Sequence, residues 1–239
     1  MILLDNARSI LLDIEGTTTP IAFVHDVLFN YARAHLREFL AANLEAEEVR
    51  ADIALLREEH AADIKEGRNP PPLTGEFEVA AYVEWLIALD RKSTGLKSLQ
   101  GKIWQQGYRE GSLKSQVFAD VAPALERWHS RGFSINIFSS GSVLAQQLLF
   151  AHTEAGDLTP FIDNYFDTNI GRKTEAESYR RIAEALGLSA GEILFISDVI
   201  AELDAANEAQ MKTLLSIRPG NVPQQGIERY PCIRTFDSI

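Results

Sequence analysis

The chain has 239 residues, of which 46% are hydrophobic, and its net charge is −11. This length allows one α/β domain plus an insertion, and the charge argues against nucleic acid as a general partner, because phosphate backbones attract basic surfaces. With a single cysteine, Cys232, no recognisable signal peptide and no apolar run long enough to span a membrane, we expect a cytoplasmic protein without an intrachain disulfide or a membrane partner.

The first predicted element is a short apolar run at residues 10–12, which is typical of a buried strand in a parallel sheet. The run leads directly into Asp13 and, two residues later, Glu15. Ligands bind at the carboxyl ends of strands in open α/β sheets, so both carboxylates are expected at the mouth of a crevice. An aspartate there can attack phosphorus or hold a metal. An ordinary polar turn after a strand is the alternative interpretation.

The region from residue 21 to residue 111 has a different pattern. Apolar residues recur at helical spacing in the stretches 24–39, 49–60, 79–89 and 99–108, with no convincing strand between them. We therefore expect an all-helical cap that excludes water and contacts the substrate. The expected domains are an α/β catalytic core made of residues 1–20 and 112–239, and a helical cap made of residues 21–111.

The alternation of helix and strand resumes after the cap. A helix is predicted over residues 121–131, and a strand over residues 133–138 ends at a Ser-Ser-Gly-Ser sequence that begins at Ser139. Hydroxyl groups and free backbone N–H groups at a strand-to-helix turn make a phosphate site, so Ser139 and Ser140 are candidate substrate ligands. Simple capping of the next helix by Ser140 or Ser142 is the alternative.

A basic residue precedes the following helix. A short strand is predicted over residues 165–168 and a helix from about residue 175 to residue 186, with Lys173 just before the helix. A lysine at a helix N-terminus opposes the helix dipole, which favours a role for Lys173 in neutralising phosphate charge. An ordinary surface lysine is the alternative.

The fourth polar strand end follows the apolar residues 193–196, where Asp198 is expected to join Asp13 and Glu15 in an oxygen-rich pocket. Such a pocket suits Mg²⁺, which takes few carboxylates and keeps several waters. Glu202 lies one helical turn further on, where it would accept a hydrogen bond from a metal-bound water or from Lys173, or simply be exposed. The chain closes with predicted strands at residues 213–217 and 233–236.

Taken together, these elements predict an α/β fold, with a Rossmann-like doubly wound parallel sheet as the core and an inserted all-helical cap. The order of Asp13-x-Glu15, Ser139, Lys173 and Asp198 resembles the four motifs of the haloacid dehalogenase superfamily. More specifically, the chain resembles the enolase-phosphatase (acireductone synthase) family of methionine salvage over nearly its whole length. That resemblance is carried by residues 13–24, by the Leu-Gln-Gly-x-Ile-Trp stretch at 99–104, and by residues 139–142, 166–168 and 218–221.

The resemblance implies enolisation and then dephosphorylation of 2,3-diketo-5-methylthiopentyl 1-phosphate in L-methionine salvage. It implies that Asp13 is the nucleophile, that Glu15 is the general acid and base, and that Ser139, Ser140 and Lys173 hold the phosphate. It also implies one Mg²⁺ per chain, held by Asp13, Glu15 and Asp198, with the Glu15 position contributing its side chain or its backbone carbonyl. The enolisation base stays open between Glu15 and a residue of the cap such as His25, and nothing in the sequence requires more than a monomer.

Other functions are compatible with the same motifs. A different Mg²⁺-dependent phosphatase or phosphomutase of the superfamily would share the core residues and differ in its substrate. A dehalogenase would use the same aspartate without a metal, and Glu15, Lys173 and Asp198 argue against it. A non-catalytic phosphate-binding module is disfavoured, because all four motif positions hold chemically competent side chains.

Overall fold

The computed structural model describes residues 4–74, 78–89, 91 and 93–239. The chain divides into two compact units, of which the first contains Met1–Val24 and Lys114–Ile239 and the second contains His25–Leu113. Each unit is described by itself below. No helix among the described residues combines the length and the apolar character needed to cross a membrane.

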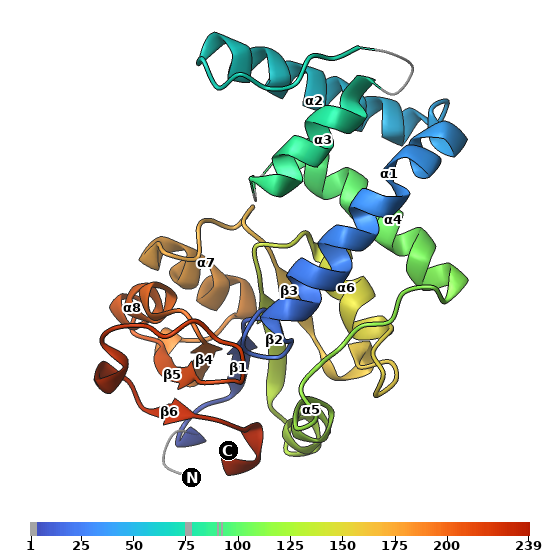
Figure 1. Cartoon of the computed structure of the whole chain (residues 1–239). Coiled ribbons are helices and arrows are strands. Elements are labelled where there is room, and N and C mark those ends of the chain that lie inside the picture. The colour runs from blue at the N-terminus through green and yellow to red at the C-terminus, as the bar shows by residue number, and fades with distance from the viewer. Residues whose placement is uncertain (1–3, 75–77, 90, 92) are drawn as a thin grey trace. The chain divides into compact units, whose positions relative to one another are not determined.

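A parallel sheet forms the centre of the first unit (Figure 1). Within the described residues its order is β3-β2-β1-β4-β5-β6. The strands are β1 (Ser9–Leu12), β2 (Ser134–Phe138), β3 (Asn164–Phe166), β4 (Ile193–Ser197), β5 (Lys212–Ser216) and β6 (Cys232–Ile233). Strand β1 is central, because Ile10 pairs with Ile135 of β2 on one side and with Leu194 of β4 on the other. All four residues of β1 are buried, as expected for a strand that is covered on both faces.

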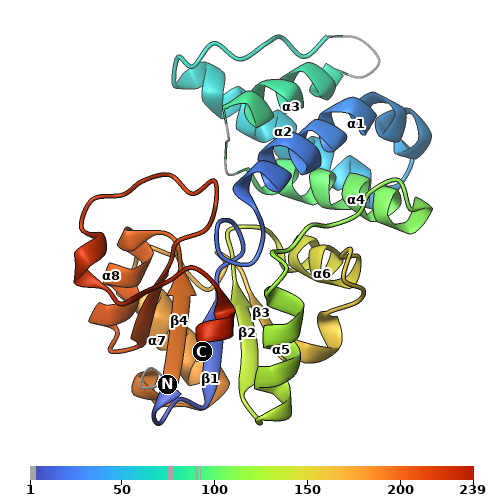
Figure 2. The same cartoon turned by 60° about the horizontal axis from the view of Figure 1, so that its bottom comes forward.

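Helices pack on the sheet around these strands (Figure 2). They are α5 (Val121–Ser130), α6 (Val143–Ala151), α7 (Ala176–Leu186) and α8 (Ile200–Glu208). Helix α5 packs on β2 and α6 on β3, while α8 packs on β4, β5 and α7. One buried cluster joins Leu11, Phe138 and Phe195 of the strands to Tyr179 of α7 and Leu203 of α8. The sheet and its helices confirm the predicted α/β, Rossmann-like core.

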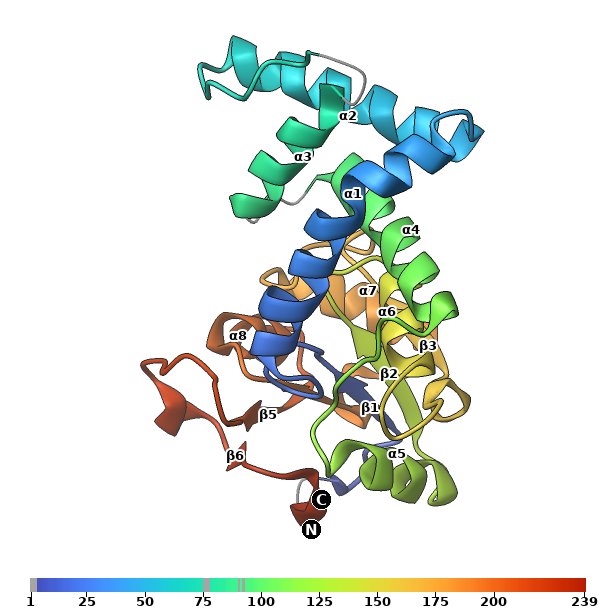
Figure 3. The same cartoon turned by 45° about the vertical axis from the view of Figure 1, so that its right-hand side comes forward.

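The second unit is helical in its described residues. A π-helical turn (Phe23–Leu28) spans the boundary between the units and leads into α1 (Phe29–Asn43), which is followed by α2 (Glu47–Lys65), α3 (Glu78–Ala88) and α4 (Thr94–Glu110). Helix α4 packs against both α1 and α2 (Figure 3). Ser93 caps α4 by accepting a hydrogen bond from the backbone N–H of Leu96, and Gly111 ends the helix in the left-handed conformation with φ of 75°.

Two contacts explain the packing of α1 on α4. The Trp104 indole N–H donates to the carbonyl of Leu28 at 2.8 Å, and its ring stacks on Phe29. Gly107 lies against the Tyr31 ring, where a Cβ atom would come within 2.5 Å of the phenolic oxygen. The Gln-Gly-x-Ile-Trp stretch of α4 therefore has a packing role within the helical unit.

One predicted strand differs from the structure. The sequence indicates a last strand over residues 233–236, but β6 contains only Cys232 and Ile233. The Thr235 hydroxyl accepts a hydrogen bond from the backbone N–H of Asp237 at 3.2 Å, which starts a 3₁₀ turn at Phe236. This side-chain cap competes with strand pairing and ends the strand early.

Candidate active site

Three of the predicted polar positions lie at the carboxyl ends of neighbouring strands. Asp13 follows β1, and its backbone N–H donates to the carbonyl of Ile196 in β4 at 3.0 Å. Ser139 follows β2, and Asp198 follows β4. Because β2, β1 and β4 are adjacent and parallel, these three ends share one edge of the sheet.

Lys173 brings two carboxylates together at this edge. Its ammonium forms ion pairs with the Asp13 carboxylate and, at 2.7 Å, with Glu202 of α8. The Glu202 carboxylate also accepts a hydrogen bond from the Ser197 hydroxyl at 2.9 Å. Tyr179 anchors the lysine backbone, since its hydroxyl donates to the Lys173 carbonyl at 2.7 Å. Lys173 is buried, so it is not an ordinary surface lysine.

The electrostatics of the cluster follow from burial and like charges. Burial acts to lower the pKa of Lys173, but the charges of Asp13 and Glu202 outweigh it and raise that pKa. Burial, followed by the charges of Asp13 and Glu202, raises the pKa of Asp198 to about 7. Burial also raises the pKa of Glu202 to about 6, although Lys173 opposes this shift. The cluster therefore holds more negative charge than its one ammonium neutralises.

Gly16 lets the loop after β1 approach Asp198. Its φ of 70° lies in the left-handed region, and a Cβ atom at this position would overlap the Asp198 carboxylate. The backbone N–H of Gly16 donates to the carbonyl of Thr19 at 2.8 Å, which closes the turn. Glu15, which is half-buried in this turn, forms a β-bridge with Thr19. The loop thus brings the backbone next to Glu15 against Asp198.

The Ser-Ser-Gly-Ser turn joins β2 to α6. Ser139 is buried and its hydroxyl accepts a hydrogen bond from the N–H of Gly141 at 3.2 Å, while Ser140 is half-buried. Ser142 caps α6 by accepting from the N–H of Ala145. Gln146, which the sequence analysis did not single out, donates to the carbonyls of Gly141 and Phe166, each at 2.9 Å. Its amide fixes the turn to the end of β3.

The carboxylates at the Asp13 edge are candidate ligands for a metal ion. Among the described residues, no group of three or more His, Cys, Asp and Glu side chains is arranged to hold a metal ion. The buried carboxylates of Asp13, Asp198 and Glu202 share the single ammonium of Lys173, and a divalent cation would balance the remaining negative charge. Two carboxylates and a backbone carbonyl also suit Mg²⁺, which keeps several waters and needs few protein ligands. The residues present therefore fit Mg²⁺.

Two amide side chains that the sequence analysis did not select contact the acidic loops. Asn221 donates to the carbonyl of Gly16 at 3.0 Å, and Gln224 donates to the carbonyl of Asp198 at 2.5 Å. Residues 218–221 entered the sequence analysis only as part of the family resemblance, and no local pattern identifies partners so far away in the chain.

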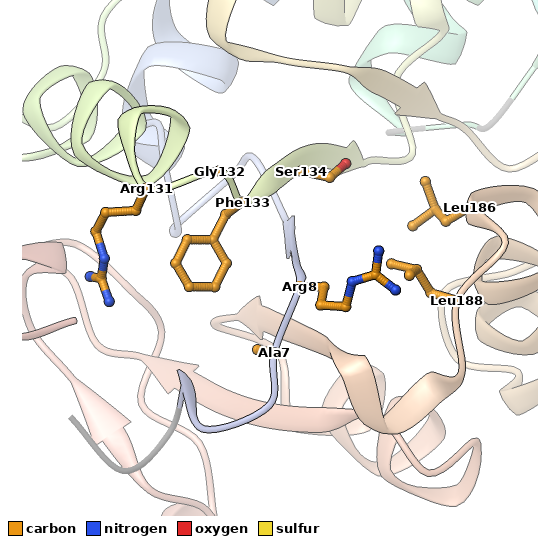
Figure 4. A pocket seen from close by; sticks show the side chains of 8 residues that line it. All are labelled: Ala7, Arg8, Arg131, Gly132, Phe133, Ser134, Leu186 and Leu188. Carbon is orange, nitrogen blue, oxygen red and sulfur yellow. The ribbon is translucent and has the colours of Figure 1, made fainter.

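A separate cavity of about 420 Å³ lies at the amino ends of β1 and β2 (Figure 4). Its lining residues are Ala7, Arg8, Arg131, Gly132, Phe133, Ser134, Leu186 and Leu188. They include none of the candidate site residues. Since ligands of open α/β sheets bind at the carboxyl ends of the strands, we place the candidate active site at the Asp13 edge.

A family model described as a haloacid dehalogenase-like hydrolase matches residues 7–210. The chain is 53% identical to enolase-phosphatase E1 from Synechococcus elongatus over 97% of both chains. It is 48% identical to enolase-phosphatase E1 from Sorangium cellulosum, over 98% of this chain and 97% of that relative. It is also 44% identical to a probable bifunctional methylthioribulose-1-phosphate dehydratase/enolase-phosphatase E1 from Sorghum bicolor, over 98% of this chain and 47% of that longer protein.

Solved structures agree with this relationship. The crystal structure of the UTR4 protein from Saccharomyces cerevisiae matches with a TM-score of 0.80 and 34% identity, over 98% of this chain and 100% of that chain. A structure of CbbY from Rhodobacter sphaeroides in complex with xylulose-(1,5)bisphosphate matches with a TM-score of 0.57 and 16% identity, over 96% and 95% of the two chains. The second likeness concerns the fold alone.

Proposed function

Because the chain belongs to the haloacid dehalogenase-like hydrolases and, within them, to the enolase-phosphatase E1 family, we propose that it is the enolase-phosphatase of methionine salvage. It converts 2,3-diketo-5-methylthiopentyl 1-phosphate through an enol phosphate to the acireductone 1,2-dihydroxy-3-keto-5-methylthiopentene and phosphate. The observation that carries the phosphatase chemistry is the buried contact of Asp13 with Lys173 beside Asp198.

The relative from Sorghum bicolor supports the choice of substrate. Its name joins an enolase-phosphatase to a methylthioribulose-1-phosphate dehydratase in one chain. Loss of water from a 2-keto-3,4-diol phosphate leaves a 2,3-diketo phosphate, which is the substrate proposed here. The product of one reaction would thus be the substrate of the other.

Dephosphorylation would proceed in two displacements. The Asp13 carboxylate attacks phosphorus and breaks the bond to the enol oxygen, while Glu15 donates a proton to that leaving oxygen. Glu15 then takes a proton from the water that attacks the aspartyl-phosphate, which frees phosphate and restores Asp13. Lys173, Ser139 and Ser140 would hold the phosphate oxygens, with the lysine ammonium offsetting the charge that develops there.

One Mg²⁺ would be held by the carboxylates of Asp13 and Asp198 and by Glu15 through its backbone carbonyl. When bound, the ion supplies charge neutralisation to the phosphate and to the diketone oxygens. The support for this site is the fit of the donor set and the burial of Asp198 beside carboxylates that share only one ammonium. The helical unit would serve as the cap that excludes water from the reaction.

The test is to follow phosphate release and the absorbance of the enol intermediate from the diketo phosphate, with and without Mg²⁺. We expect metal-dependent release preceded by the enol signal, and little turnover of simple sugar phosphates. Asp13→Asn should lower phosphate release by at least about 10³-fold, because the amide is not a nucleophile. Asp237→Asn, at an exposed position, is the control. Normal release by Asp13→Asn would remove Asp13 as the nucleophile.

We further propose that the protein acts as a monomer in the cytoplasm. The support for the compartment is the single cysteine, Cys232, which is free and exposed, as expected in a reducing environment. Light scattering coupled to size exclusion should give the mass of one chain at micromolar concentration.

A further inference from the structure

The segment that follows β5 contacts both loops that carry the site carboxylates. On the loop after β1, the Arg218 guanidinium donates to the carbonyl of Thr17 at 3.1 Å. The Asn221 amide donates to the carbonyl of Gly16 at 3.0 Å, which also accepts from the Ser216 hydroxyl at 3.3 Å. The carbonyl of Gly16 is thus held by two side chains from the other end of the chain.

On the loop after β4, Gln224 makes two contacts. Its amide nitrogen donates to the carbonyl of Asp198 at 2.5 Å, and its amide oxygen accepts from the N–H of Ile200 at 2.9 Å. The second bond also satisfies a free N–H at the start of α8. One short stretch of chain, residues 218–224, therefore joins the Asp13 loop to the Asp198 loop.

The geometry at Gly16 places these contacts beside the candidate metal ligands. A Cβ atom on Gly16 would meet both the Asp198 carboxylate and, at 3.0 Å, the amide oxygen of Asn221. That oxygen is buried without a hydrogen-bond partner. The peptide between Glu15 and Gly16 is held at its N–H by Thr19, and the next carbonyl is held by Asn221. The Glu15 carbonyl lies in the same rigid peptide plane as the N–H of Gly16. Its direction is therefore set by the Thr19 bond to that N–H and by the Asn221 bond to the carbonyl that follows.

We infer that Asn221 and Gln224 are positioning residues, which hold the Glu15 carbonyl and the Asp198 carboxylate at the spacing that one Mg²⁺ requires. This inference rests on the metal site proposed above. Neither side chain is a metal ligand or a catalytic residue, since each acts through a backbone carbonyl of its loop. Outer residues that orient the ligands of a metal typically change its affinity by 10–100-fold when they are removed.

Amides suit this role for an electrostatic reason. The cluster of Asp13, Asp198 and Glu202 contains one neutralising ammonium, so an added carboxylate would increase the repulsion. An amide supplies donors to the carbonyls without adding charge. Ser216 donates to the same Gly16 carbonyl at the longer distance of 3.3 Å, whereas the amide oxygen of Asn221 also borders the space beside Gly16 that the Asp198 carboxylate approaches. It therefore provides a matched comparison for Asn221.

The experiment measures Mg²⁺ binding by calorimetry on the full-length, metal-stripped protein, together with its thermal midpoint before and after Mg²⁺. Asn221→Ala and Gln224→Ala should each weaken Mg²⁺ binding by about tenfold. Ser216→Ala and Gln225→Ala, the latter at an exposed neighbouring position, should stay within about twofold of the original protein. Saturating Mg²⁺ should restore phosphate release in both amide variants.

The outcomes separate the inference from the proposed function. Unchanged Mg²⁺ affinity in both amide variants, or an equal loss in Ser216→Ala, would overturn the positioning role. A lower thermal midpoint of the metal-free variants, combined with an unchanged Mg²⁺ affinity, would also overturn the positioning role, because it would mark a merely structural role. Equal Mg²⁺ binding by the original protein and by Asp198→Asn would instead refute the metal site itself. If an alanine variant does not fold, Asn221→Ser and Gln224→Met decide the question by the same affinity criterion.

Discussion

Lys173 is the residue on which the charge balance of the site depends. It is buried and lies between Asp13 and Glu202, so removing it leaves two carboxylates without their shared cation. Breaking a buried ion pair by removing one partner costs more than the pair contributes, because the remaining charge stays desolvated. We therefore expect the loss of the lysine to affect both the stability of the fold and the site.

We expect Lys173→Met to lower the free energy of unfolding by about 3–5 kcal/mol, because methionine keeps the volume but not the charge. Phosphate release should fall by at least about 100-fold, since the phosphate loses an electrostatic partner. Denaturant unfolding and steady-state kinetics measure the two effects. The exposed Lys65→Met is the control, and equal behaviour of the two variants would show that Lys173 supports neither the fold nor the phosphate release.

At the residue scale, the sequence identified the charged groups better than the groups that hold them. Asp13 and Asp198 were predicted because ligands of parallel sheets bind at the carboxyl ends of the strands, and Lys173 because a base before a helix opposes the helix dipole. Asn221 and Gln224 were missed, since the Asn221 contact spans 205 positions and both residues lie in a proline- and glycine-containing turn. Amides in such turns are ordinary, and only the folded chain reveals their partners.

At the scale of elements, the helical unit contains a charged network of its own. Asp63 of α2 is fully buried, and it accepts hydrogen bonds from the Tyr82 hydroxyl at 2.7 Å, from Arg68 at 2.5 Å and from Arg91 at 3.2 Å. Burial raises the pKa of Asp63, but these hydrogen bonds outweigh it and lower that pKa below its usual value of 3.8. The network joins α2 to α3 and to the segment before α4.

This network predicts an acid-dependent stability. A carboxyl whose folded pKa is lowered contributes stability above its unfolded pKa and loses it as the pH falls through the folded value. We therefore expect Asp63→Asn to destabilise the protein by about 1–3 kcal/mol at pH 7, and this difference to shrink as the pH falls below about 3.8. Thermal unfolding at several pH values measures it, with the exposed Glu58→Gln as control. If the difference in stability between the original protein and Asp63→Asn did not change with pH, the lowered pKa of Asp63 would be contradicted.

The end of α8 contains a local conflict between residue type and conformation. Gln210 follows the helix with φ of 68°, a left-handed conformation that disfavours residues with a Cβ atom. Its side chain is exposed and donates to the carbonyl of Asn207 at 3.3 Å. The helix could thus end with less strain at a glycine.

We expect Gln210→Gly to raise the free energy of unfolding by roughly 0.5–1 kcal/mol and the thermal midpoint by about 2–4 °C. The gain from relieved strain exceeds the added flexibility of the unfolded chain. Differential scanning calorimetry measures the midpoint. Gln147→Gly, inside α6, should instead lower it, and a fall in both variants would show that Gln210 is not strained.

Elements with strong periodicity were predicted well. The apolar runs of β1 and β4 and the helical spacing of α1–α4 all appear in the structure near the expected residues. The short β6 was misplaced because Thr235 caps a turn there, and two residues are too few to create a period. The π-helical turn at Phe23–Leu28 was not predicted, since its apolar pattern resembles that of the helix that follows.

At the scale of the molecule, the proposed catalytic and metal-binding residues all belong to the first unit. Asp13 and Glu15 precede the helical unit in the chain, and Lys173 and Asp198 follow it. The first unit also contains its own sheet and buried core. We therefore expect that the chemistry can be separated from the proposed recognition of the substrate.

Replacing residues 25–113 by a short Gly/Ser linker should leave Mg²⁺-dependent hydrolysis of p-nitrophenyl phosphate measurable. The value of kcat/KM for the diketo phosphate should fall by at least about 100-fold, because water is no longer excluded and substrate contacts are lost. Circular dichroism confirms that the shortened chain is folded. Equal losses on both substrates in a folded protein would show that the helical unit is needed for the chemistry itself.

The central place of β1 has a consequence for synthesis on the ribosome. Ile10 pairs with Ile135 and Leu194, so β1 waits after its synthesis for partners that are made more than a hundred residues later. At the usual 5–20 residues per second, this delay is roughly 6–25 s. The helical unit is completed during that interval, while the apolar strand has no sheet to join. Nascent chains of this protein are thus expected to bind holdase chaperones through the apolar residues of β1 until β2 leaves the exit tunnel.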